Sequence, residues 1–373
     1  MEQRIISADN DFYELDQWLD NNNAACVLLV CDKSIQFLEN FNEHIEKLRN
    51  RGLEIIRFDD FQPNPLYESV VKGVMVQRAH KCNVIMAVGG GSAMDVAKCI
   101  KLYCNMRGNG EEGSFLKQQI IPNDIPFLAM PTTAGTGSEA TRYAVIYNND
   151  AKQSITSDSF IPETVLMDPM SLHTLPLYQK KATMMDAFCH AIESFWSVNS
   201  TEESKEYSRM AIKLVMENMS GYLNNTISGN SGMLLAAHTA GKAINITQTT
   251  AGHAMCYKIT SLFGCAHGHA AALCDRVLFP WMIQNSGLCI DPRGEEYLKG
   301  TFGEIASAMG CSSALEAADL FNNTFDSLEL DVPEASEEQF EILKESVNPV
   351  RLKNHPVMLN SETINNLYHK ILN

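Results

Sequence analysis

The chain has 373 residues, of which 45% are hydrophobic and 20% charged, and its formal net charge is −16. This length fits two domains or one large domain, and the composition excludes an intrinsically disordered protein. The excess of acidic residues excludes binding to nucleic acid or to an anionic membrane through a general positive charge, and the longest basic run is Lys180-Lys181.

Eleven cysteines are spread along the chain without a CxxC motif, and several, such as Cys26 and Cys99, lie in apolar segments. This usage is typical of reduced thiols and not of a disulfide-rich secreted chain. No apolar stretch reaches the roughly 18–20 residues that a membrane-spanning helix needs. Residues 1–11 lack the basic and then apolar pattern of a signal peptide. We therefore expect a cytoplasmic protein.

The first half of the chain alternates short apolar runs with helical patterns. Residues 26–31 form an unbroken apolar run, which predicts a strand buried on both faces. Further strands are predicted at 53–58, 83–88 and 127–130, with helices at 66–81 and 93–103 and a surface loop at 106–113. This alternation predicts an α/β domain with a parallel, Rossmann-like sheet.

After about Asp168 the character of the sequence changes. Apolar residues recur at spacings of three and four, and β-branched runs become scarce, which predicts helices at 178–198, 204–223, 232–247 and 337–345. The sequence therefore predicts two domains, an α/β dinucleotide-binding domain over residues 1–172 and an all-helical metal-binding and substrate domain over residues 173–373.

A glycine-rich turn, Gly89-Gly90-Gly91-Ser92, follows the third predicted strand and opens a helix. Glycines let the backbone approach a ligand closely, and the helix start offers unpaired N–H groups and a positive dipole end that suit a pyrophosphate. The spacing is not the GxGxxG of the standard dinucleotide fingerprint. The alternative is an ordinary tight turn in which Ser92 caps the helix.

A second polar loop, Pro131 to Glu139, follows the fourth predicted strand and carries three threonines, one serine and two glycines. Two such loops at adjacent strand ends predict a ligand crevice at the carboxyl edge of the sheet. Asp32 ends the first strand, where an acid accepts hydrogen bonds from a ribose diol and repels a 2′-phosphate. The alternative for Asp32 is a solvated acid at a strand end.

Asp186 and His190 are four residues apart in a predicted helix, so both side chains project from one face. Downstream, His253 and the pair His267 and His269 offer further imidazoles next to small residues. One carboxylate and three imidazoles form a mixed set of oxygen and nitrogen donors, which suits Fe(II) or Zn(II) better than Ca(II) or Mg(II). Such a set leaves coordination positions open for catalysis.

Together these motifs resemble the iron-containing (group III) alcohol dehydrogenases. The matching segments are Gly89–Asp95, Pro131–Glu139, Asp186–Glu193, and His253 with His267-Gly268, and they follow in order between Val27 and Pro280. The resemblance implies an N-terminal α/β nucleotide domain and a helical C-terminal domain of dehydroquinate synthase-like architecture, with the active site in the cleft. It also implies hydride transfer between an alcohol or aldehyde and NAD(P), and a homodimer.

The resemblance assigns the site residues. The implied metal ligands are Asp186, His190, His253 and His267, holding Fe(II) or Zn(II). The implied cofactor residues are Asp32, Gly90, Gly91, Ser92, Asp95, Thr132, Thr133, Thr136, Ser138 and Lys152, and Asp32 matches the acid with which such enzymes prefer NAD(H) over NADP(H). Many members carry a proton-relaying histidine where this chain has Tyr257, so either Tyr257 relays with water or another group does.

Arg142 and Lys258 are basic where the general family usually has neutral residues, which predicts an anionic substrate. The segments 249–260 and 141–145 are most similar to the branch that reduces phosphonoacetaldehyde to 2-hydroxyethylphosphonate in phosphonate metabolism. The alternative is that the two cations are surface or salt-bridge residues, for instance with Glu139, in a general short-chain alcohol dehydrogenase. A glycerol-1-phosphate dehydrogenase, a dehydroquinate synthase and a non-catalytic nucleotide-binding protein are further alternatives, disfavoured by the 131–139 loop and the intact ligand set.

Overall fold

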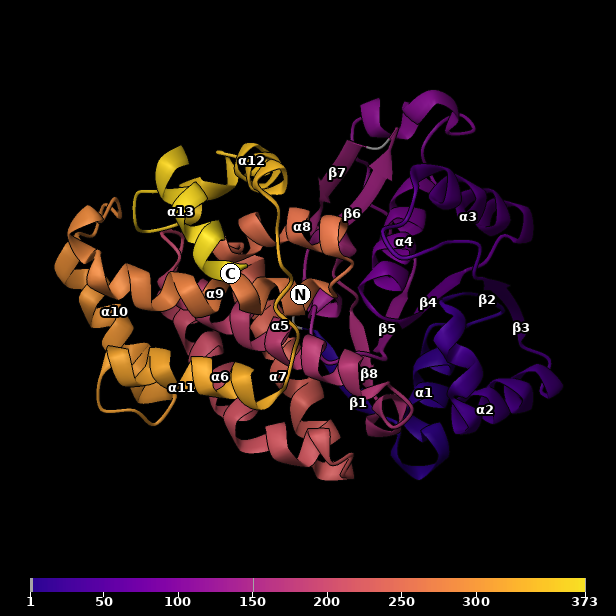
Figure 1. Ribbon diagram of the computed structural model, residues 1–373. Helices are drawn as coiled ribbons and strands as arrows, with labels where there is room; N and C mark the ends of the chain where they lie inside the picture. The colour runs from indigo at the N-terminus through magenta and orange to yellow at the C-terminus, as the bar shows by residue number, and fades with distance from the viewer. Residues whose placement is uncertain (1–2, 150, 373) are drawn as a thin grey trace. The chain divides into compact units, whose positions relative to one another are not determined.

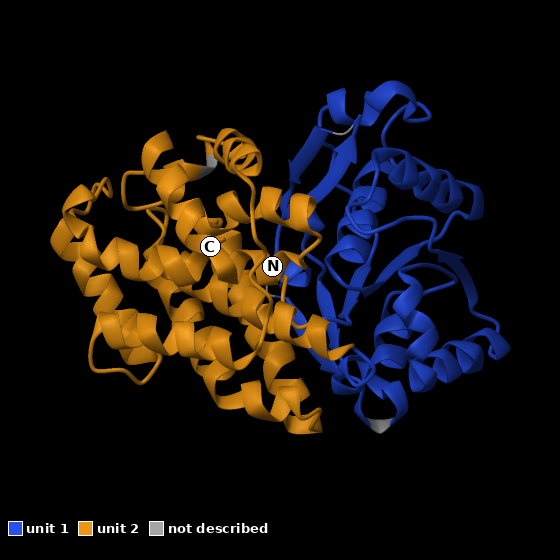
Figure 2. Cartoon of the chain, viewed as in Figure 1, with its two compact units in different colours: residues 1–133, 137–175 blue, residues 134–136, 176–373 orange. Residues whose placement is uncertain are grey.

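The computed structural model describes residues 3–149 and 151–372. The chain forms two compact units (Figure 2), which we call the α/β unit, residues 1–133 and 137–175, and the helical unit, residues 134–136 and 176–373. The helical unit begins three residues after the boundary predicted from the sequence. The short segment Ala134–Thr136 groups with the helical unit, which the sequence does not reveal because only two residues separate this segment from the strand at Phe127–Pro131.

A six-stranded parallel sheet forms the centre of the α/β unit, with the strand order β1-β8-β5-β4-β2-β3 (Figure 1). The strands are β1 (Arg4–Ser7), β2 (Cys26–Cys31), β3 (Glu54–Phe58), β4 (Val84–Gly89), β5 (Phe127–Pro131) and β8 (Thr164–Met167). The four strands predicted from the sequence are β2 to β5. In the register of the sheet, Val27 of β2 pairs with Val84 of β4, and Ile85 of β4 pairs with Phe127 of β5.

Helices cover both faces of this sheet, so the central strands are apolar at every position. Figure 1 shows α1 (Asp9–Asn21) and α2 (Glu39–Asn50) on one side, and α3 (Tyr67–His80) and α4 (Gly91–Tyr103) on the other. Successive residues of β2 enter different cores: Val27 and Leu29 pack with the core of α1 and α2, whereas Leu28 packs with that of α3 and α4. The predicted α/β fold with a parallel sheet is confirmed.

The hairpin of β6 (Tyr143–Asn148) and β7 (Ala151–Thr156) and the strands β1 and β8 are not predicted from the sequence. The strands β1 and β8 have four residues each, too few for a period of two to be distinguished from chance. The β7 sequence, AKQSIT, is mostly polar. Short 3₁₀ segments connect the elements, at Lys33–Phe37, Glu111–Lys117, Ser138–Ala140, Asp158–Phe160 and Pro169–Leu172. The predicted loop at 106–113 therefore continues into one such segment.

The helical unit is built around α5, whose residues from Ala182 to Trp196 are largely buried. Its helices are α5 (Leu177–Trp196), α6 (Glu202–Leu223), α7 (Ile227–Thr247), α8 (Ala251–Phe263), α9 (His267–Gln284), α10 (Glu295–Ala308), α11 (Ala314–Ser327), α12 (Glu337–Ser346) and α13 (Ser361–Ile371). Helices α6, α7 and α9 pack against α5. Among the described residues, none of the helices has both the length and the apolar character that crossing a membrane requires.

Candidate active site

Three of the predicted metal ligands converge in the helical unit. Asp186 lies in α5, His253 in α8, and His267 is the first residue of α9. Each offers one ligand atom, and these atoms lie within 4.8 Å of one another. Asp186 and His253 are buried, with Asp186 Oδ1 3.4 Å from His253 Nε2. A carboxylate and two imidazoles held this closely fit Fe(II) or Zn(II).

His190, the fourth predicted ligand, lies beside this group. It follows Asp186 by one turn of α5, and its ring stacks on that of His253 with 4.4 Å between centroids and 15° between planes. Its Nδ1 lies 3.4 Å from the backbone oxygen of Gly135, to which a protonated Nδ1 donates. Burial, opposed by the Asp186 carboxylate, lowers the pKa of His190, which favours the neutral ring, in which Nε2 keeps its lone pair.

Glu193 orients His253 by binding Nδ1, the ring nitrogen opposite the one that faces Asp186. The sequence motifs assign Glu193 no role. Its carboxylate is fully buried and accepts hydrogen bonds from His253 Nδ1, from the His253 amide at 3.1 Å and from Thr250 Oγ1 at 2.6 Å. Burial alone would lower the pKa of His253, but the carboxylates of Glu193 and Asp186 raise it to about 10. The Nδ1 bond holds the proton on Nδ1 and turns Nε2 toward Asp186, an arrangement common around metal-binding histidines.

His267 is held by its neighbours on α8. Its Nδ1 lies 3.6 Å from the Cys256 thiol, and the ring of Tyr257 stacks on it with 5.3 Å between centroids. The start of α9 approaches α5 so closely that a Cβ on Gly268 would lie 2.2 Å from the backbone oxygen of Ala182. Glycine is therefore required after His267 for this imidazole to reach the group.

His269, the other candidate of this pair, has a different environment. One ring nitrogen lies 3.1 Å from Tyr178 Oη, and the other lies 2.8 Å from the backbone oxygen of Asp331. Both ring nitrogens are thus occupied by protein groups, which gives His269 a structural role. The Tyr178 hydroxyl also accepts a hydrogen bond from the Ala266 amide, next to His267.

In the α/β unit, the glycine turn lies at the carboxyl edge of the sheet. The strands β2, β4 and β5 are neighbours, so the residues after them meet at one edge, as predicted. Gly89 has φ +152°, and a Cβ there would lie 2.5 Å from Asp32 Oδ2. Gly90 precedes α4 as its N-cap and Gly91 begins the helix, so Ser92 does not cap it, and the alternative of a Ser92-capped turn is wrong. Since Gly90 has no side chain, the first amides of α4 remain available for an anion.

The Asp32 carboxylate is part of this turn. Its Oδ1 accepts hydrogen bonds from the Ser34 hydroxyl and, at 2.8 Å, from the Ser34 amide, and its Oδ2 accepts one from the Gly90 amide at 3.2 Å. Thr132 Oγ1 lies 3.5 Å from the Ser34 hydroxyl, and its backbone amide donates to Gly89 at 3.0 Å. Asp32 therefore connects the ends of β2 and β4. The predicted cofactor crevice lies at this edge of the sheet.

The other predicted cofactor residues lie on several different elements of the chain. Thr133 lies against Gly90, where a Cβ would be 3.3 Å from Thr133 Cγ2, and Thr136 belongs to the segment that groups with the helical unit. Asp95 Oδ1 accepts a hydrogen bond from Ser138 Oγ at 3.0 Å. Lys152 lies in β7, opposite Tyr147.

Comparison with known proteins settles the family. Residues 2–169 match the family model described as iron-containing alcohol dehydrogenase, and residues 180–372 match that of the C-terminal part of the Fe-containing alcohol dehydrogenase family. The chain belongs to the iron-containing alcohol dehydrogenase family. It is an oxidoreductase that acts on alcohols or aldehydes, as the resemblance of its motifs predicted.

Relatives of this enzyme differ in their substrates. The 1,3-propanediol dehydrogenase of Klebsiella pneumoniae is 30% identical over 303 residues, covering 78% of this chain and 75% of the relative. The phosphonoacetaldehyde reductase of Streptomyces viridochromogenes is 30% identical over 253 residues, covering 64% of each chain. The structure of sulfoacetaldehyde reductase from Bifidobacterium kashiwanohense in complex with NAD+ has the same fold, with a TM-score of 0.87, 24% identity and coverage of 99% and 97%.

The two predicted substrate cations of the enzyme lie in different units. Arg142, with 37% of its side chain exposed, lies in the α/β unit, where Nη1 is 3.5 Å from Asp158 Oδ1 and Nε is 3.4 Å from Tyr143 Oη. Lys258 lies in α8 of the helical unit, next to Tyr257, and is partly exposed. The partner Asp158 is itself 86% exposed, so water screens this ion pair.

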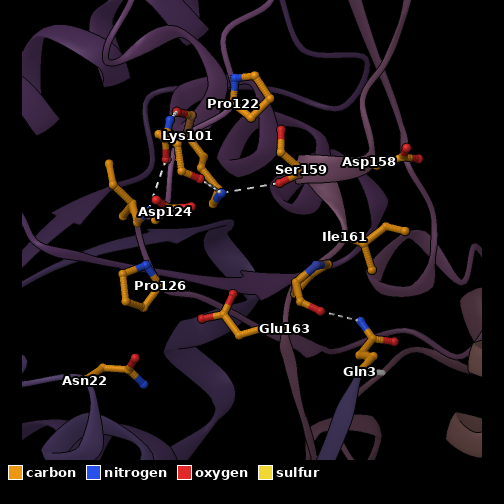
Figure 3. Close-up of a pocket in the computed structure, with 13 residues that line it drawn as sticks. Gln3, Asn22, Lys101, Pro122, Asp124, Pro126, Asp158, Ser159, Ile161 and Glu163 are labelled. Atoms are coloured by element: carbon orange, nitrogen blue, oxygen red, sulfur yellow. Dashed lines mark hydrogen bonds between the residues drawn. The ribbon is translucent and has the colours of Figure 1, made fainter. Parts of the chain in front are cut away.

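A pocket of about 600 Å³ opens in the α/β unit of the enzyme at the other edge of the sheet (Figure 3). The residues that line it precede the strands, as Pro126 precedes β5 and Glu163 precedes β8, together with Lys101 from α4. The glycine turn follows β4 instead. This pocket therefore lies at the amino edge of the sheet and is distinct from the predicted cofactor crevice.

Proposed function

We propose that the enzyme reduces phosphonoacetaldehyde to 2-hydroxyethylphosphonate with NADH and a divalent metal ion, Fe(II) or Zn(II). The observation that carries the metal-dependent part is the convergence of Asp186, His253 and His267, of which the first two are buried, with the ring of His190 stacked on that of His253. We assign all four residues as ligands. When bound, the metal supplies a positive charge that polarises the aldehyde oxygen.

The protein's own residues bind and orient the two reactants. The amides at the start of α4, after Gly90, provide donors for the cofactor pyrophosphate. We assign the ribose diol to Asp32, which by its charge also disfavours the 2′-phosphate of NADPH. The proposed cofactor site is completed by Gly91, Ser92, Asp95, Thr132, Thr133, Thr136, Ser138 and Lys152.

Reduction of the aldehyde adds a hydride to its carbon and a proton to its oxygen. Tyr257 takes the place of the family's usual relay histidine, and its ring stacks on His267. We assign to the Tyr257 hydroxyl the task of holding and passing this proton, through water. A tyrosine hydroxyl can donate a proton to the reduced oxygen and recover one from water.

Arg142 and Lys258 supply the positive charge that selects an anionic aldehyde. This assignment is supported by the relative named phosphonoacetaldehyde reductase and by the fold shared with a sulfoacetaldehyde reductase, since both names denote aldehydes with a strongly acidic group. The second candidate, a general short-chain alcohol dehydrogenase, is supported by equal identity to a 1,3-propanediol dehydrogenase over a longer part of the chain.

A substrate panel distinguishes the two functions. Enzyme loaded with Fe(II) or Zn(II) is assayed for oxidation of NADH and NADPH with phosphonoacetaldehyde, a carboxylated aldehyde and propanal. The proposal expects the highest kcat/KM with phosphonoacetaldehyde and NADH. Equal turnover of propanal contradicts the anionic substrate and favours the general alcohol dehydrogenase.

A further inference from the structure

Lys98 is a buried lysine of α4 that binds a segment outside the helix. Its side chain is 0% exposed. Its ammonium donates to the backbone oxygens of Ser138 at 2.6 Å, Thr141 at 2.9 Å and Tyr143 at 2.8 Å. The hydroxyls of Ser138 and Thr141 lie at 3.0 and 3.1 Å. An ammonium has three N–H groups, so the three carbonyls alone saturate it.

Asp95, one turn earlier in α4, accepts hydrogen bonds from the same segment, whereas Lys98 donates them. Its Oδ1 accepts from Ser138 Oγ at 3.0 Å, and its Oδ2 accepts from the Val145 amide at 3.0 Å. Asp95 and Lys98 together therefore bind residues 138 to 145 through both donors and acceptors. We call Asp95 and Lys98 the α4 clamp.

The clamped segment begins outside the strands and α-helices of the unit. Ser138–Ala140 is a single 3₁₀ turn entered through Gly137, which has φ +57°. It lies between β5 and β6 and is not a strand of the six-stranded sheet. A buried ammonium is costly unless it is fully hydrogen-bonded, so Lys98 and the carbonyls hold one another in a single geometry.

In the sequence, Arg142 lies between Thr141 and Tyr143, whose carbonyls both bind Lys98. We propose that Lys98 is a positioning residue that fixes the backbone on both sides of Arg142 and so aims its guanidinium at the anionic group of the substrate. This inference rests on the proposed role of Arg142. Lys98 itself touches neither substrate nor cofactor in this scheme. Burial lowers the pKa of Lys98 to about 8, opposed by Asp95 and Glu139, so the side chain stays mostly cationic at neutral pH.

The chain offers a matched control on the same helix. Lys101 follows Lys98 by one turn and is 6% exposed, and it donates to the backbone oxygens of Asn123 at 3.0 Å and Ser159 at 3.4 Å (Figure 3). Lys98→Met and Lys101→Met thus each remove a buried ammonium from α4, but only the first releases residues 138–143. General destabilisation of α4 would affect both variants.

Hydrogen exchange of the metal-loaded enzyme tests the clamp without reference to activity. Lys98→Met should speed amide exchange in residues 138–145 at least about tenfold, whereas Lys101→Met should leave this segment at the wild-type rate. Equal protection in wild type and Lys98→Met overturns the clamp. If Lys98→Met does not fold, Lys98→Arg serves instead: its planar guanidinium keeps the charge but cannot direct N–H groups to three converging carbonyls, so the same segment should lose protection.

Kinetics then test the link to Arg142. Lys98→Met should lower the ratio of kcat/KM for phosphonoacetaldehyde to that for propanal about tenfold, through KM, and should lower it no further in an Arg142→Ala background. Independent, multiplying losses in the double variant overturn the link to Arg142. If Arg142→Ala alone leaves the ratio unchanged, the proposed substrate is wrong, and the exchange experiment still decides on the clamp.

Discussion

The carboxylate of Glu193 accepts a hydrogen bond from Nδ1 of His253, while the opposite nitrogen of the same ring lies 3.4 Å from Asp186 Oδ1. Glu193 and Asp186 are seven residues apart, two turns of α5, so one helix holds both acids on either side of an imidazole from α8. The ring can rotate only by breaking a buried, charge-assisted hydrogen bond. The direction of Nε2 is thus fixed before a metal arrives.

Replacing Glu193 should therefore weaken the metal site. In Glu193→Gln the NH2 group of the new amide would face either the Nδ1–H of His253 or the donors of Thr250. Two donors would then meet, so at least one buried hydrogen bond is lost. We expect the metal Kd to rise about 10–100-fold, measured by calorimetry against a competing chelator. Glu304→Gln, which changes an acid paired with Lys205 and Arg209 elsewhere in the helical unit, is the control and should leave the Kd unchanged.

Metal binding should release protons. Because the pKa of His253 is raised to about 10 in the metal-free protein, this ring carries a proton at pH 7 that the metal must displace. The apparent affinity should therefore fall by about tenfold for each unit that the pH drops between 8 and 6, with one proton released per ion. Calorimetry in buffers of different ionisation enthalpy measures the proton count. An affinity that does not change with pH would show that His253 carries no extra proton in the metal-free protein.

His190→Ala should lose both bound metal and activity. Its ring stacks on His253 beside the three converging ligands, and we assign its Nε2 to the metal. Metal content after dialysis, measured by atomic emission, should fall well below one ion per chain. His269→Gln is the matched control, since this imidazole is also buried but is occupied by Tyr178 and Asp331. A His190→Ala enzyme that keeps its full metal content would remove His190 from the ligand set.

Much of the fold is predictable because its strongest signals are local. The unbroken apolar runs of β2, β4 and β5 exist because each strand is covered on both faces. The weak signals of β1, β7 and β8 have equally physical causes, since two of these strands are very short and one is mostly polar. The spacing of Asp186 and His190 is likewise local to one helix.

The residues that hold the site residues in place, such as Glu193 and Lys98, cannot be predicted from local sequence patterns. Glu193 matters only because Thr250 and His253, 57 and 60 residues later, bind it from the N-cap and the first turn of α8. A lysine such as Lys98 normally indicates a solvent-exposed position, and nothing near it in the chain reveals that three carbonyls some 40 residues later surround its ammonium. Sequence motifs therefore identify the groups that do chemistry more readily than the groups that hold them.

Asp32 should set the preference for NADH. Asp32→Asn keeps an acceptor for the Gly90 amide and removes the charge, whereas Asp32→Gly removes both. We expect the ratio of kcat/KM for NADH to that for NADPH to fall at least about tenfold in both variants, because the repulsion of a 2′-phosphate disappears. Asp32→Gly should also raise the KM for NADH, since the turn loses its support. A wild-type enzyme that prefers NADPH would contradict this assignment and leave the fold unaffected.

Arg142→Ala tests the substrate most directly. A charge-assisted hydrogen bond to a phosphonate is worth about 1.5–3 kcal/mol, and since the side chain is 37% exposed, screening by water favours the lower value. We expect the KM for phosphonoacetaldehyde to rise about tenfold, with that for propanal unchanged, because a neutral aldehyde never uses the contact. Asp158→Asn is the control, as it removes the acid that pairs with Arg142 and should keep or lower the KM. Equal losses on both aldehydes in Arg142→Ala would make Arg142 a structural residue and favour a general alcohol dehydrogenase.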